Sequence, residues 1–208
     1  AVFRHVLCVY PYRRGLKGWR FCPPLGLECI GAVIEPHTEV LDIIDLRKER
    51  NRTIDFLRPE TDLVCFSVNW DREVEFLREE INSVPPDIST ILGGRHSTLD
   101  PEDWLVRCPN VNAVVRGDGE EVIEDVCQGV PFEKIPGLSF RNGKEIFHNP
   151  KRRLGALSDH HFPSRNLRRY TYEVELENIG MGVEHDLVSA SRGCPFNCTY
   201  CSFNRNPW

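Results

Sequence analysis

The sequence has no apolar run long enough to cross a membrane and no excess of positive charge. Its 208 residues include 26 Lys and Arg against 31 Asp and Glu, for a formal net charge of -5. A basic face for nucleic acid is therefore not expected. No apolar run approaches the roughly 20 residues that span a bilayer. The N-terminal run, which contains Arg4 and His5, does not resemble a signal peptide. We predict no nucleic-acid partner and no membrane span.

Two common nucleotide-binding signatures are also missing. The turn Gly117-Asp118-Gly119-Glu120 is not followed by the Gly-Lys-Ser/Thr of a phosphate-binding loop, and it lacks the GxGxxG form of a nicotinamide site. The nine cysteines are odd in number and show no spacing typical of a secreted domain. Cys8, Cys65 and Cys127 lie inside apolar segments, where buried free thiols are expected. We therefore predict a cytoplasmic protein in a reducing compartment.

What the sequence does contain is a regular alternation of apolar strands and helices. We predict strands at 4–11, 39–45, 62–69, 89–94 and 111–116. We predict helices at 25–35, 52–57, 72–84, 101–108 and 121–130, with Asp100 as an N-cap. This alternation predicts an α/β fold, a doubly wound, Rossmann-like parallel sheet of order 2-1-3-4-5. Ligands of such sheets bind in the crevice at the carboxyl ends of the strands.

The pattern changes in the C-terminal third of the chain. Residues 137–149 read as a hairpin about Asn142-Gly143 that extends or covers a sheet edge. Residues 151–178 read as a linker of mixed order, and 185–191 as a strand that leads into a cysteine-rich loop. We predict domain boundaries at 1–135, 136–184 and 185–208.

Several residues at the predicted carboxyl edge could serve a ligand. Gly93 and Gly94 end the fourth strand, and Gly117 and Gly119 follow the fifth, where missing side chains let a ligand approach the backbone. Ser67 ends the third strand at the same edge. Each also has a structural interpretation: tight turns for the glycines, and an ordinary hydrogen-bonded serine for Ser67.

Three cysteines, Cys194, Cys198 and Cys201, have C-x3-C-x2-C spacing on a segment with Gly, Pro and Asn, which disfavour regular structure. Such a loop can wrap three thiolates around one inorganic group. Structural zinc is usually bound by four ligands, and no His or Cys follows Cys201. Three free or zinc-bound cysteines are the alternative to a cluster with one open iron.

The cysteine loop resembles that of radical S-adenosylmethionine (SAM) enzymes. The motifs PPLGLE (23–28), SVN (67–69), GGRHST (93–98) and RGDGEE (116–121) resemble the cobalamin-binding domain that precedes the catalytic barrel in B12-dependent radical SAM enzymes. The resemblance runs from about Val6 to Ser202. Two departures are the Asp of Gly-Asp-Gly-Glu, where Glu is usual, and Asn69-Trp70, where Thr often stands.

The resemblance implies three cofactors: cobalamin, a 4Fe-4S cluster and SAM. Cys194, Cys198 and Cys201 would be the iron ligands, and Tyr200 would lie near the adenine of SAM. Ser67, Gly93, Gly94, Gly117 and Gly119 would bind cobalamin. Reductive cleavage of SAM would give a 5'-deoxyadenosyl radical for methyl transfer to an unactivated carbon, with cyclisation or rearrangement as alternatives.

The resemblance also implies an electron donor such as flavodoxin or ferredoxin, and a small-molecule substrate that the sequence does not identify. We expect the chain to be the N-terminal part of a longer enzyme and to be inactive alone, with catalytic residues in the missing barrel. Two other classes compete with this interpretation. One is a cobalamin-binding sensor without catalysis, and the other is a radical SAM enzyme whose Rossmann-like domain is empty and serves as a substrate or partner platform.

The sequence lacks the Asp-x-His-x-x-Gly loop that supplies a cobalt-ligating histidine in cobalamin mutases. The nearest match, Asp159-His160-His161, lies in the linker, with Ser164 where Gly is required. We therefore predict base-off cobalamin without a histidine on cobalt. The loop 12–23 would offer Tyr12, Trp19 and Phe21 to the corrin.

Overall fold

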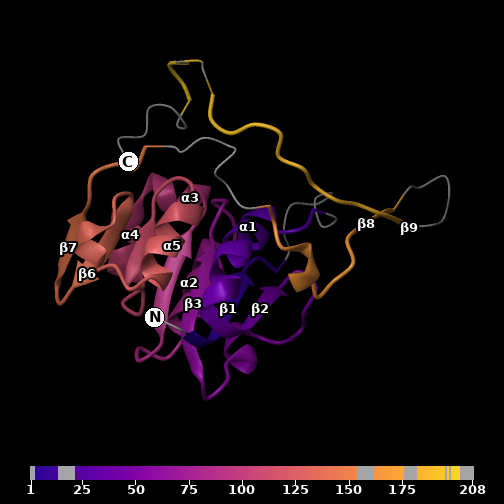
Figure 1. Ribbon diagram of the computed structural model, residues 1–208, viewed down its shortest axis with the longest axis horizontal. Helices are drawn as coiled ribbons and strands as arrows, with labels where there is room; N and C mark the ends of the chain where they lie inside the picture. The colour runs from indigo at the N-terminus through magenta and orange to yellow at the C-terminus, as the bar shows by residue number, and fades with distance from the viewer. Residues whose placement is uncertain are drawn as a thin grey trace.

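The computed structural model describes residues 3–13, 22–153, 162–175, 182–194, 196 and 198–201. Within this part of the chain, a seven-stranded sheet has the order β2-β1-β3-β4-β5-β6-β7 (Figure 1). Neighbouring strands are parallel from β2 to β5, whereas β6 and β7 are antiparallel. The strands are β1 Phe3–Tyr10, β2 Thr38–Asp45, β3 Thr61–Ser67, β4 Ser89–Gly93, β5 Ala113–Val115, β6 Leu138–Asn142 and β7 Glu145–His148.

Helices connect the parallel strands. They are α1 Leu25–Ile34, α2 Val74–Asn82, α3 Arg95–Leu99, α4 Pro101–Arg107 and α5 Glu120–Cys127. Short 3-10 helices lie at Glu35–His37, Thr53–Phe56, Phe132–Lys134 and Arg165–Leu167. The Asp100 side chain accepts a hydrogen bond from the Asp103 N–H, so the predicted N-cap is confirmed. Among the described helices, none combines the length and hydrophobicity needed to cross a membrane.

The predicted doubly wound sheet of order 2-1-3-4-5 is confirmed for the five parallel strands. The predicted hairpin adds two strands at the edge opposite β2 (Figure 1). β6 pairs with β5, with Leu138 opposite Val115, and Gly143 turns the chain at a φ of 61°. The binding crevice predicted from this topology should therefore lie where β3, β4 and β5 end.

The core explains why the central strands read as continuous apolar runs. Val6, Leu7, Cys8 and Val9 in β1 have no exposed surface, because helices cover both faces of the sheet. Cys8, Cys65 and Cys127 are all buried, as predicted.

The described part of the linker is docked against the sheet domain rather than loosely ordered. Leu167 packs against α1 at Gly31, where an added Cβ would lie 3.0 Å from Leu167 Cδ1. Arg168 forms a two-pronged ion pair with Glu28 of α1, at 2.5 and 3.0 Å. Glycine in α1 thus makes room for the returning chain, and a buried carboxylate anchors it.

The strand predicted at 185–191 is wrong. β9 (Gly182–Glu184) pairs with β8 (Glu173–Glu175), and residues 185–191 have no strand assignment. A strand requires a neighbour for its backbone hydrogen bonds, and in the described part of the chain the pairing with the β8 side ends at the bond from the His185 N–H to the Tyr172 carbonyl, 2.6 Å. Apolar content alone could not supply that neighbour.

Candidate functional site

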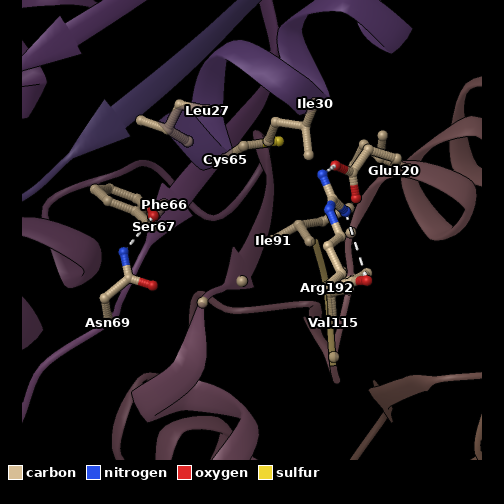
Figure 2. Close-up of a pocket in the computed structure, with 17 residues that line it drawn as sticks. Leu27, Ile30, Cys65, Phe66, Ser67, Asn69, Ile91, Val115, Glu120 and Arg192 are labelled. Carbon is tan, nitrogen blue, oxygen red and sulfur yellow. Dashed lines mark hydrogen bonds and ion pairs between the residues drawn. The ribbon is translucent and has the colours of Figure 1, made fainter. Parts of the chain in front are cut away.

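A cavity of about 250 Å³ opens at the carboxyl ends of β3, β4 and β5. It lies beside the point where the strand order reverses, between β1 and β3, which is where ligands of doubly wound sheets bind. Five of the residues predicted from sequence line it: Ser67, Gly93, Gly94, Gly117 and Gly119. The structure therefore brings together residues that are up to 52 positions apart (Ser67 to Gly119). Figure 2 shows this cavity and the side chains around it.

Gly94 is required by the backbone itself. Its φ is +103° and its ψ is 170°, a conformation almost restricted to glycine. An added Cβ would lie 2.6 Å from the Val68 carbonyl oxygen and 2.7 Å from Asn69 Oδ1. The same carbonyl accepts the N–H groups of His96 and Ser97 at the start of α3. The tight-turn interpretation therefore accounts for Gly94 without any ligand.

Gly93 differs from its neighbour. Among the described residues, no heavy atom lies within 4 Å of the position that its Cβ would occupy, and its φ is not positive. Protein packing therefore does not explain the missing side chain, and that empty space belongs to the cavity. Gly117 has similar open space, but its φ of +87° also favours glycine.

The Ser67 hydroxyl is oriented by Asn69. Asn69 Nδ2 donates to Ser67 Oγ at 2.8 Å, and Asn69 Oδ1 accepts from the Arg95 backbone N–H at 3.2 Å (Figure 2). Because Ser67 Oγ is the acceptor in this contact, its own hydrogen can be donated to a ligand. The sequence left the contribution of Asn69 open, and the structure assigns it this orienting contact.

Tyr12 supports the loop that follows β3. Its side chain is 1% exposed, and its hydroxyl accepts from the backbone N–H groups of Asn69 at 2.9 Å and Trp70 at 2.7 Å. The expectation that Tyr12 is offered to a ligand is therefore corrected, because protein groups already occupy its hydroxyl. Trp19 and Phe21, predicted beside it, lie outside the described residues.

A second cavity, of about 180 Å³, adjoins the first one. The two share Gly26, Ser67 and Asn69, and the second is also lined by Tyr10 and Trp70. Trp70 Nε1 donates to Tyr10 Oη at 3.3 Å, which fixes the indole at the rim. The crevice therefore extends from the end of β1 to the end of β5. Gly26 was not singled out as a site residue, although it belongs to the PPLGLE motif.

Sequence reasoning also missed Arg192. Its guanidinium lies 2.5 Å from Glu120 Oε1 and 3.5 Å from Asp118 Oδ2, and it lines the larger cavity (Figure 2). The hydrogen bond to Glu120 raises the pKa of Arg192. Nη2 also lies 3.8 Å from Cys29 Sγ, and burial raises the pKa of that thiol to about 11. The only signal in the sequence was the position of Arg192 directly before Gly193-Cys194.

The cysteine loop is less enclosed. Cys194 is exposed, and Cys198 and Cys201 are half-buried. In the described part of the chain, no three His, Cys, Asp or Glu side chains converge to hold a metal. Tyr200 is 89% exposed and does not line the cavity. Iron ligation by the three cysteines, and adenine contact by Tyr200, stay predictions.

Among the described residues, neither cavity is lined by a histidine that could reach cobalt. His96 of α3 packs edge-on against Trp104, with ring centroids 5.7 Å apart, and burial lowers its pKa. Asp159-His160-His161 lies outside the described residues.

Comparison with known proteins identifies a family and several relatives. A family described as the B12 binding domain matches residues 20–127. The hopanoid C-3 methylase of Methylococcus capsulatus is 28% identical over 95% of this chain and 39% of its own length. The anaerobic magnesium-protoporphyrin IX monomethyl ester cyclase of Cereibacter sphaeroides is 30% identical over 57% of this chain and 20% of its own length.

A solved structure shares the fold. TsrM of Kitasatospora setae, a radical S-adenosylmethionine methyltransferase with cobalamin and a 4Fe-4S cluster bound, superposes with a TM-score of 0.62. It is 19% identical, and the match covers 78% of this chain and 31% of that one. The chain spans about two fifths or less of the length of the curated relatives described above.

Proposed function

The chain belongs to the B12-binding domain family, and from that premise we propose that its crevice binds cobalamin within a B12-dependent radical SAM enzyme. The observation that carries this proposal is the open space at Gly93. It is a cavity-lining position at a strand end, and no atom of the described residues lies close enough to forbid a side chain there. A ligand that approaches the backbone there explains the glycine.

The residues at the crevice suit the nucleotide tail of cobalamin. Gly93 and Gly117 leave the backbone open, Ser67 presents an oriented hydroxyl, and Leu27 and Phe66 add apolar surface. Pockets for such ligands combine apolar walls with few, well-placed polar groups. The described lining contains no histidine, which supports binding without a protein nitrogen on cobalt.

In the longer enzyme, cobalamin would carry a methyl group, and the cluster with SAM would supply a 5'-deoxyadenosyl radical. This chain's own part would be to seat the cobalamin tail and to bring Cys194, Cys198 and Cys201 to the cluster. The hopanoid C-3 methylase relative supports methyl transfer, which we propose is directed to an unactivated carbon. The cyclase relative supports ring formation as the second candidate. The longer enzyme would act on a small-molecule substrate and would receive electrons from a donor such as flavodoxin or ferredoxin.

Titration of this chain with hydroxocobalamin tests the binding proposal. We expect the visible spectrum to shift, and we expect Gly93→Leu to remove the shift by filling the tail site. Lys144→Leu, on the exposed hairpin turn, adds the same side chain away from the crevice and should bind normally. An unchanged spectrum for the wild-type chain, or normal binding by Gly93→Leu, would refute the assignment.

Electron paramagnetic resonance of the cob(II)alamin form tests the axial ligand. We expect no nitrogen splitting from the protein, so a splitting that disappears in a His→Ala variant would refute base-off binding without histidine.

The cluster assignment has its own test. Anaerobic reconstitution of the longer enzyme with iron and sulfide should give iron–sulfur absorbance that alanine at all three cysteines abolishes. A triple variant that reconstitutes like the wild type would exclude them as ligands.

A further inference from the structure

The segment that leads into the cysteine loop is held at two places. Near its start, Asp186 pairs with Arg165 and Arg168, at 2.6 Å in each case. Residues 188–191 are then exposed. At the cysteine end, the Arg192 side chain turns back into the cavity and is only 21% exposed. Arg192 is therefore a contact through which the cysteine loop meets the crevice.

The partner of Arg192 is firmly placed. Glu120 begins α5, and its side chain is 7% exposed. Directly before it, the position of an added Gly119 Cβ lies 3.2 Å from Ile30 Cγ2, because α5 packs closely against α1. Arg192 thus reaches the end of a packed helix, at the same turn that lines the proposed tail site (Figure 2).

We propose that Arg192 is a positioning residue that couples the two cofactor sites: its ion pair with Glu120 holds the cysteine loop at the mouth of the cobalamin cavity. This inference rests on the proposed function. Arg192 is not among the residues expected to bind either cofactor, and its proposed role is to connect the two cofactor sites.

Charge at the cavity mouth gives the coupling its direction. Asp118 and Glu120 place two carboxylates there, and Arg192 sets a cation between them. The nucleotide tail of cobalamin carries an anionic phosphodiester, which two uncompensated carboxylates would repel. A partly buried cation is screened less than a surface one, so a docked Arg192 favours the tail. By linkage, bound cobalamin must favour the docked loop by the same factor.

Nuclear magnetic resonance of the 208-residue chain measures both sides of this coupling. Methylcobalamin is the probe, because its cobalt is diamagnetic and does not exchange its ligand with thiols in the dark. The heteronuclear NOE of the backbone amides of residues 192–194 and 196–201 reports loop motion on the picosecond-to-nanosecond scale. A spectrophotometric titration gives the affinity of each variant.

We expect the wild-type NOE values to rise when methylcobalamin saturates the protein. Arg192→Gln and Glu120→Gln should show low values that do not rise. Arg192→Gln should also bind methylcobalamin at least about fivefold more weakly, at the lower end of usual coupling factors. Arg192→Lys, which keeps the charge, should recover most of both effects. Arg107→Gln removes an exposed arginine paired with Asp103 and should behave as wild type.

Three results would overturn the inference. Arg192→Gln could bind and move like wild type, Arg107→Gln could reproduce its effects, or methylcobalamin could make the loop more mobile by displacing Arg192. A wild-type chain that does not bind methylcobalamin would refute the proposed function and the coupling with it. Binding without an Arg192 effect would refute the coupling alone.

Discussion

Replacing the two adjacent glycines at the end of β4 should separate a folding requirement from a ligand requirement. Gly94→Ala forces a Cβ into a glycine-only backbone conformation, which costs about 1–3 kcal/mol. The atoms in its way include the Val68 carbonyl carbon and oxygen, 2.8 and 2.6 Å from the new Cβ, so relief requires a backbone shift. Overpacking of that kind adds about 1–3 kcal/mol. Together these give a loss of about 2–6 kcal/mol.

Gly93→Ala should have the opposite profile. The new methyl group meets no heavy atom of the described residues within 4 Å, and φ there is not positive. The substitution restricts the unfolded chain, so stability should stay level or rise by up to about 1 kcal/mol. Cobalamin binding should nevertheless weaken, because the methyl group projects into space that the proposal assigns to the ligand.

Urea unfolding followed by circular dichroism measures the first effect, and cobalamin titration measures the second. If heat is used in place of urea, each kcal/mol of lost stability corresponds to about 2–4 °C in Tm for a chain of this size. The reasoning fails if Gly94→Ala unfolds at the wild-type midpoint. It also fails if Gly93→Ala loses stability as Gly94→Ala does, since the two positions would then share one structural role.

Three further predictions concern stability. Arg168→Met leaves the 1%-exposed Glu28 carboxylate without its two-pronged partner. Urea unfolding should show that the free energy of unfolding falls by about 3 kcal/mol. An unchanged midpoint would contradict the role of this ion pair as a buried anchor. Tyr12→Phe removes the acceptor of the backbone N–H groups of residues 69 and 70. We expect the free energy of unfolding to fall by about 2 kcal/mol in the same assay. No change would mean that water replaces the hydroxyl. Burial lowers the pKa of His5 below its usual 6.5. As the pH falls, the unfolded chain therefore binds a proton at His5 before the folded chain does. The free energy of unfolding should decrease as the pH is lowered from about 6.5. His5→Gln should flatten that drop, and a slope equal to wild type would exclude His5 as its source.

The location of the crevice could be predicted from the sequence because local patterns encode it. Continuous apolar runs identify the buried strands, and the helices between them require parallel neighbours. In a parallel sheet the carboxyl ends meet at one edge, so Ser67, Gly93 and Gly117 had to lie near one another. The cysteine spacing is also local, and it indicates a metal loop whether or not the rest of the chain is known.

Only the tertiary structure decided which distant groups meet. Arg192 and Glu120 are 72 positions apart, and Arg168 and Glu28 are 140 apart. A charged residue has no periodicity that identifies its partner, so neither ion pair could be predicted. The strand expected at 185–191 failed for a related reason, because pairing depends on a neighbour that local composition does not specify. The pattern of apolar residues in a segment indicates which of them are buried, whereas contact between segments depends on how the whole chain folds.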